Sequence, residues 1–145
     1  MKRAASSLFL VIGLLLAAGH PAAAQLATVG PLAVTTAVAG AQPAPVIGNS
    51  TYAATIAFAG QMRIVCSLNA NMPTGTTLKV RLTAPSGGTS LGDVVLDVTA
   101  RNIVTAATPV FFTNVTIRYT FTPTVAAGVL PLTTRTATYT LMTWP

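Results

Sequence analysis

Apolar and polar residues alternate one by one along several stretches of this chain, and residues 111–121 form the longest of them. This period of two is that of a β-strand with one buried face. Shorter alternating stretches occupy residues 51–59, 62–68, 76–82, 102–106 and 134–144, and residues 29–38 are a further candidate strand. Helical periodicity of useful length is absent, and frequent threonine favours strands. The sequence therefore predicts an all-β protein.

Residues 76–99 give the clearest local prediction, which is a β-hairpin. The apolar residues of its two arms are Leu78, Val80 and Leu82 on the first and Val94, Leu96 and Val98 on the second. Residues 84–88, Ala-Pro-Ser-Gly-Gly, provide the reversal between the arms. Two registers keep both apolar sets on one face, and they place Arg81 near Asp93 or, one step over, Lys79 near Asp97.

The first 24 residues have the layout of a secretory signal peptide. Lys2 and Arg3 precede an apolar run over residues 8–18, and three alanines end at Ala24, after which we expect cleavage. The apolar run is shorter than the roughly 20 residues of a membrane-spanning helix, so we expect no stable membrane span after cleavage. This layout predicts an exported protein of the periplasm, the cell surface or the extracellular medium.

The residues after the signal peptide suffice for one domain with a single core. We expect residues 25–50 to be an apolar N-terminal extension or a first strand, and residues 51–145 to form one β-sandwich domain. Seven or eight strands joined by short turns predict a two-sheet Greek-key sandwich of immunoglobulin-like type, with a closed barrel as the alternative. The short connection at Gly60 and Gln61 predicts a second hairpin, between residues 51–59 and 62–68.

Few side chains of the mature chain can carry chemistry. The single histidine, His20, lies in the expected signal peptide, so a serine or cysteine nucleophile would have no imidazole base. Asp93 and Asp97 lie four residues apart on one strand face and do not flank a cleft. One cysteine with scattered methionines does not make a metal site, and two carboxylates are few for calcium. We therefore expect no enzymatic activity, no cofactor and no metal, and we assign no catalytic, cofactor-binding or metal-ligating residue.

The one cysteine, Cys66, cannot form an internal disulfide. It lies on the same alternating set as Met62, Ile64 and Leu68, which predicts a buried thiol that acts as a small apolar side chain. An intermolecular disulfide or a reactive thiol is the alternative. The core must then hold the fold without a covalent cross-link.

Positive charge exceeds negative charge along the whole chain. Removal of Lys2 and Arg3 with the signal peptide lowers the formal net charge from +6 to +4. The remaining cations are Arg63, Lys79, Arg81, Arg101, Arg118 and Arg135. They fall in five separate segments and are not interleaved with a set of aromatic residues, so the sequence predicts no cationic cluster and no binding to nucleic acid.

The last alternating stretch, Thr-Arg-Thr-Ala-Thr-Tyr-Thr-Leu-Met-Thr at residues 134–143, resembles the closing strand of bacterial spore-coat-U and pilin-like subunits. Those subunits end in alternating strands rich in threonine and tyrosine. The resemblance covers this strand and the general exported all-β layout, and it carries over no functional residue. It implies an exported β-sandwich subunit.

Few charges and many Thr, Ala and Val residues predict a weakly polar surface that is prone to strand pairing, which favours a protein that assembles. We expect an exported, non-catalytic structural or adhesive protein of the cell envelope that acts through surfaces and sheet edges, as a self-assembling fibre or coat subunit. Its contacts with protein partners or with its own copies would involve residues 25–48 or the last strand.

The alternative is a monomeric periplasmic or secreted binding module for a small molecule or a glycan. Aromatic side chains are the usual platforms for sugar rings. The candidates for such a platform are Tyr52, Phe111, Phe112 and Trp144.

Overall fold

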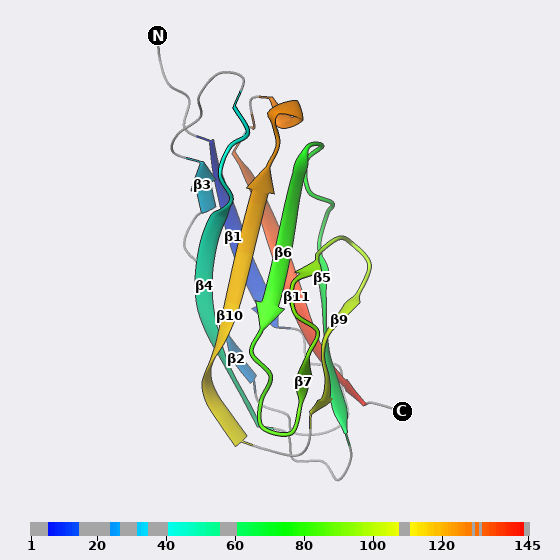
Figure 1. The fold of residues 1–145 in the computed structure, drawn as a ribbon. Coiled ribbons are helices and arrows are strands. Elements are labelled where there is room, and N and C mark those ends of the chain that lie inside the picture. Colours follow the sequence, from blue (N-terminus) through cyan, green and yellow to red (C-terminus); the bar gives the residue numbers. More distant parts are fainter. Residues whose placement is uncertain are drawn as a thin grey trace.

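Two β-sheets packed face to face make up the described part of the chain (Figure 1). The computed structural model describes residues 6–14, 24–26, 32–34, 41–55, 61–107, 111–128, 130 and 132–143. The all-β prediction and the two-sheet sandwich are confirmed. Helical structure in these residues is limited to the 3₁₀ turn η1 (Val125–Ala127), and no helix among them has the length and apolar character that a bilayer crossing requires.

The strands alternate strictly between the two sheets along the chain. Sheet A contains, in spatial order, β3 (Leu32–Val34), β1 (Ser6–Leu14), β11 (Thr133–Thr143), β5 (Met62–Leu68), β9 (Arg101–Ala107) and β7 (Thr89–Ser90). Sheet B contains β2 (Ala24–Leu26), β4 (Val46–Thr55), β10 (Phe111–Pro123), β6 (Thr76–Leu82) and β8 (Val94–Val95). Neighbouring strands are antiparallel except β1 and β11, which are parallel.

This alternation shows that the predicted hairpin between residues 51–59 and 62–68 is wrong. β4 pairs with β10 and β2 in sheet B, whereas β5 pairs with β11 and β9 in sheet A. The reason is geometric, because alternating side chains and a short turn fit a crossing between two packed sheets as well as they fit a hairpin.

The hairpin predicted for residues 76–99 forms only in part. β6 and β8 pair antiparallel, with Lys79 opposite Val95, but between them the chain enters sheet A as β7. Of the two registers, the one that joins Arg81 and Asp93 is confirmed by a distance of 2.7 Å between Nε and Oδ1. The alternating pattern predicts that Val98 lies on the apolar face, but its side chain is 52% exposed. The pairing with β6 ends at Val95, and the chain bends at Val98.

The described residues contain eleven strands, more than the seven or eight predicted. Two of the additional strands, β7 and β8, have two residues each and lie within residues 76–99, for which the sequence predicts a single hairpin. Three others, β1 to β3, lie within the first 34 residues. The long strands agree well with the predicted stretches, since β10 and β11 differ from them by two residues or fewer at each end. β4 begins at Val46, earlier than the predicted start at residue 51.

One hydrophobic core fills the space between the sheets. Its fully buried side chains include Leu78, Val80 and Leu82 of β6, Ile117 and Tyr119 of β10, and Ile103 and Val104 of β9. The predicted inward face of β10 is confirmed, and its exposed side chains alternate with the buried ones. Tyr119 of sheet B and Tyr139 of sheet A meet inside the core, where their hydroxyl oxygens lie 2.7 Å apart.

Gly75 immediately precedes β6 and lies against η1. Its φ of +76° lies in the left-handed region that favours glycine. Its carbonyl oxygen accepts hydrogen bonds from both the backbone N–H and the side-chain hydroxyl of Thr124, each at 2.8 Å. A Cβ added at this position would lie 2.5 Å from the backbone nitrogen of Ala127. The approach of η1 therefore requires glycine here.

Candidate functional site

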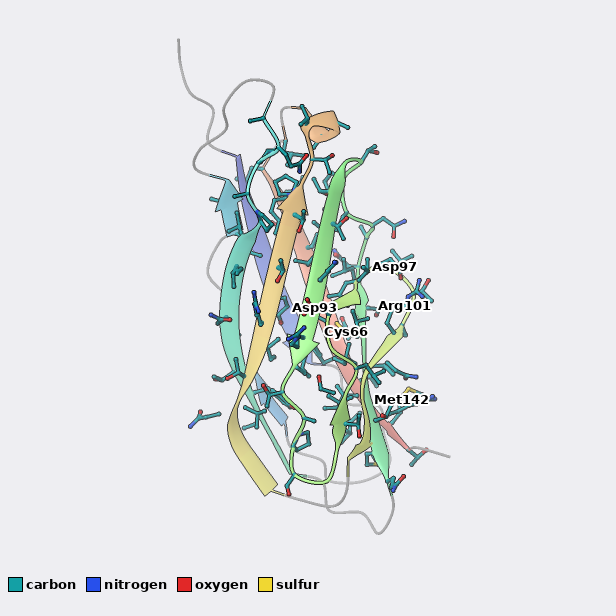
Figure 2. All side chains as sticks on the ribbon, viewed as in Figure 1. Cys66, Asp93, Asp97, Arg101 and Met142 are labelled. Carbon is teal, nitrogen blue, oxygen red and sulfur yellow. The ribbon has the colours of Figure 1, made fainter. Side chains whose placement is uncertain are left out.

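Cys66 lies in β5 in the middle of the core and is fully buried, as predicted (Figure 2). Burial raises the pKa of its thiol from 9.0 to about 12, although a hydrogen bond with Tyr139 acts in the opposite direction. A neutral, buried thiol is a poor nucleophile. In the folded protein the Cys66 side chain therefore acts as a small apolar group that packs in the core.

We expect the stability of the fold to decrease as the pH rises from about 9 to about 12. The pKa of Cys66 is raised in the folded state, so the unfolded chain loses its thiol proton first and alkaline pH favours unfolding. Burial also raises the pKa of Tyr119 and Tyr139, which extends the effect to higher pH. Urea midpoints measured between about pH 8 and about pH 11 test this.

Two further observations check the Cys66 prediction. The Cys66→Ala variant should show a weaker pH dependence of the urea midpoint than the natural chain, because one of the shifted groups is gone. A thiol reagent should label Cys66 only in denaturant, and rapid labelling of the folded protein would contradict the buried, neutral thiol.

The two carboxylates occupy separate ion pairs and do not share a site. Asp93 pairs with Arg81 on sheet B, and Asp97 pairs with Arg101, whose Nη2 lies 2.5 Å from Oδ2. Figure 2 shows Asp97 and Arg101 side by side, with Asp93 apart from them. The hydrogen bond from Arg101, followed by one from the backbone N–H of Thr99, lowers the pKa of Asp97.

The described residues contain no group of three or more His, Cys, Asp or Glu side chains that could hold a metal ion. The methionines do not gather either, since Met62 is buried in the core and Met142 is exposed near the end of β11 (Figure 2). Thus these side chains offer no combined ligand set.

The proposed aromatic platform is not assembled by the residues that the structure describes. Tyr52 is 7% exposed and its hydroxyl donates a 2.8 Å hydrogen bond to the carbonyl oxygen of Thr83. Its ring is therefore part of the core and does not form an exposed platform for a sugar. The side chains of Phe111, Phe112 and Trp144 lie outside the described residues.

The first candidate surface is one edge of β11. β1 pairs with it in parallel from Leu8 opposite Thr133 to Leu14 opposite Tyr139. The backbone N–H of Thr136 bonds to the side-chain oxygen of Asn69, and its carbonyl accepts the N–H of Asn69, on the side of β5. Because successive residues of a strand direct their backbone groups to opposite sides, those of Arg135 and Ala137 are directed toward β1.

The second candidate surface is the outer face of sheet B, which carries Lys79, Arg81 and Arg118. We call these three residues the basic face. Arg118 of β10 lies directly opposite Arg81 of β6. Lys79 lies two residues before Arg81 in β6 and is opposite Thr120. Arg81 and Arg118 are exposed, and β4, β10 and β6 lie in front in Figure 1 without other strands over them. The expectation that the cations are scattered is therefore wrong.

Compared with known proteins, the chain matches no family model and no curated protein sequence. The two surfaces must therefore be interpreted from their own chemistry.

The sequence predicted the last strand as a surface for assembly but gave no indication of the basic face. The basic face depends on which strands are neighbours, and residues 81 and 118 are far apart in the chain. The edge of β11 beside β1 could not be predicted, because the sequence predicts a signal peptide for the residues that form β1. The alternating pattern placed Arg81 and Arg118 on outer strand faces correctly, but it carries no signal that these faces belong to adjacent strands.

Proposed function

We propose that this protein is an exported, non-catalytic structural subunit of the cell envelope that self-assembles through the edge of β11. The observation that carries the proposal is the pairing of β11 with β1, which lies within the expected signal peptide. Cleavage after Ala24 removes β1 and leaves the backbone groups of residues 133–139 on that side without their partner. A long, unpaired strand edge with few charges is a template for another strand.

The N-terminal extension is the proposed donor of that strand. Among the described strands, β3 pairs with β1 alone, with Leu32 opposite Leu8, so cleavage also removes this partner of β3. The same event thus opens a strand position beside β11 and frees β3 from its strand pairing. β3 lies within an uncharged segment, residues 25–45, that can fill this position in a second copy.

The described outermost strands β2, β7 and β8 are much shorter than β11. β2, β7 and β8 contain two or three residues each, and short edge strands are a common protection against unwanted pairing. The resemblance of residues 134–143 to the closing strands of spore-coat-U and pilin-like subunits supports the same class of function.

The finer architecture that we propose is a Greek-key, immunoglobulin-like sandwich. Its support is that strands distant in sequence are neighbours in each sheet, as β5 and β9 are in sheet A and β10 and β6 are in sheet B. Crossings between the sheets connect them, which is characteristic of sandwiches of this type.

We expect residues 25–145 to form assemblies that grow with concentration and survive reductant, while the full chain stays monomeric because β1 covers β11. Light scattering after size exclusion measures both masses. A chain that begins at residue 46 should fold and remain monomeric, because it lacks the donor segment. A monomer of residues 25–145 at all concentrations would contradict the proposal.

Two substitutions at one position of β11 test the edge itself. Arg135→Pro removes the N–H directed toward the vacated position, and proline is tolerated where a strand edge is unpaired. Arg135→Gln keeps that N–H and, like proline, removes the guanidinium that donates to the carbonyl of Asn71. Assembly should be lost in the proline variant and retained in the glutamine variant. Equal assembly of the two would show that the contact lies elsewhere.

A further inference from the structure

We infer that the basic face on the outside of sheet B binds an acidic polysaccharide whose charges are carboxylates. This surface is independent of the β11 edge, which belongs to sheet A. The inference starts from the positions of Lys79, Arg81 and Arg118 on two neighbouring strands.

Arg81 and Arg118 face each other across β6 and β10, an arrangement in which like charges repel. Asp93 relieves part of this repulsion through its 2.7 Å contact with Arg81. Arg118 lies opposite Asn49 on its other side, so its cross-strand neighbours include no acid. The strand register therefore places two arginines opposite each other, with one carboxylate paired to Arg81, and a bound anion would add to the neutralisation.

Lys79 extends the positive charge along β6. Its cross-strand neighbours are Thr120 and Val95, and the described residues provide it with no ion pair. With Asp93 as the only acid beside them, three cations leave the face with a net positive charge. The Arg81 and Asp93 side chains are 50% and 41% exposed, so solvent and an incoming ligand reach this pair.

The side chains around the basic face indicate which polyanion it would take. Two of them, Ile47 opposite Thr120 and Val95 opposite Lys79, are apolar and exposed. The others include hydroxyl and amide groups from β4 and β10, namely Asn49, Thr51, Thr116 and Thr120. Such groups exchange hydrogen bonds with sugar hydroxyls, and the planar guanidinium of arginine matches a carboxylate in a bidentate manner.

The same surroundings argue against nucleic acid and against a small ion. Tyr119, Phe121 and Tyr52 point into the core, so the described part of this face has no aromatic ring on which bases could stack. The cations lie on the exposed face of a sheet, which suits a linear polymer lying across the strands more than an enclosed ion. Export, which belongs to the proposed function, would place the face among envelope polysaccharides.

The test measures binding of the full chain to polygalacturonate, with neutral dextran as the uncharged control. Arg118→Gln should weaken binding about 1.5- to fivefold, as expected for loss of one exposed ionic contact. Arg101→Gln changes the net charge equally on sheet A, away from the basic face, and should leave binding unchanged. Asp93→Asn should strengthen binding, because it removes the one acid on the face. Binding should weaken as salt increases.

Several results would overturn the inference. Equal loss of binding in Arg118→Gln and Arg101→Gln would show a simple net-charge effect, and unchanged binding in Arg118→Gln would show that the face is not used. Tighter binding to single-stranded DNA or to vesicles with anionic lipid than to polygalacturonate would reject the ligand class. Circular dichroism checks that each variant folds. Assembly of residues 25–145 is scored separately, so failure of the edge proposal and failure of this inference are distinguishable.

Discussion

Gly75→Ala is expected to destabilise the fold by about 2–5 kcal/mol, because two penalties act at one position. The first is the φ of +76°, which an L side chain rarely adopts. The second is the 2.5 Å approach of the new Cβ to the backbone nitrogen of Ala127. Relief of this contact requires η1 to move, which would weaken both hydrogen bonds from Thr124 to the Gly75 carbonyl. Urea unfolding followed by far-UV circular dichroism measures the loss.

Gly92→Ala is the matched control for Gly75. Gly92 has a φ of +75°, but an added Cβ there meets no atom within 4 Å. The control should therefore show the conformational penalty alone, about 1–2 kcal/mol. If both variants lose the same stability, the approach of η1 to Gly75 does not constrain the fold.

Tyr139→Phe is expected to cost about 1–3 kcal/mol, because it leaves the buried hydroxyl of Tyr119 without its partner. Tyr119→Phe should cost less, because the Tyr139 hydroxyl still has the thiol of Cys66 beside it. The double variant removes both hydroxyls and should be closer in stability to the natural chain than Tyr139→Phe is. These differences identify a hydrogen bond that joins the two sheets.

A double-mutant cycle over Tyr119 and Tyr139 measures this coupling directly. The free energy of unfolding is determined for the natural chain, both single variants and the double variant under the same conditions. Additive losses would mean that the hydroxyls act independently, and the 2.7 Å contact would then contribute no coupling to stability.

The strand faces could be predicted from the sequence because burial follows the alternation of side chains. In β10, Ile117 and Tyr119 are fully buried and Arg118 between them is exposed, as the pattern predicts. The Arg81–Asp93 contact was also one of two registers that the apolar pattern allowed. In each case the local sequence contains the information.

The order of the strands could not be predicted in the same way. The sequence of residues 51–68 does not distinguish a hairpin from a crossing between sheets. The predicted pairing of β4 with β5 is therefore wrong, since β4 pairs with β10 and β5 with β11. The proximity of Arg81 and Arg118 likewise depends on the pairing of β6 with β10. Pairing of distant segments is decided by the packing of the whole core, which a local pattern does not record.

The parallel pairing of β1 with β11 joins the beginning of the chain to its end. During synthesis, β1 emerges from the ribosome before β11, so this pairing can form only after residues 133–139 have been made. If the first 24 residues are removed while the chain is still being made, β11 never meets β1 and reaches its destination with a free edge. A precursor that is completed before cleavage can instead cover its own edge until β1 is removed. The relative timing of translation and cleavage would then decide how long a given molecule stays capped before it can act as a building block.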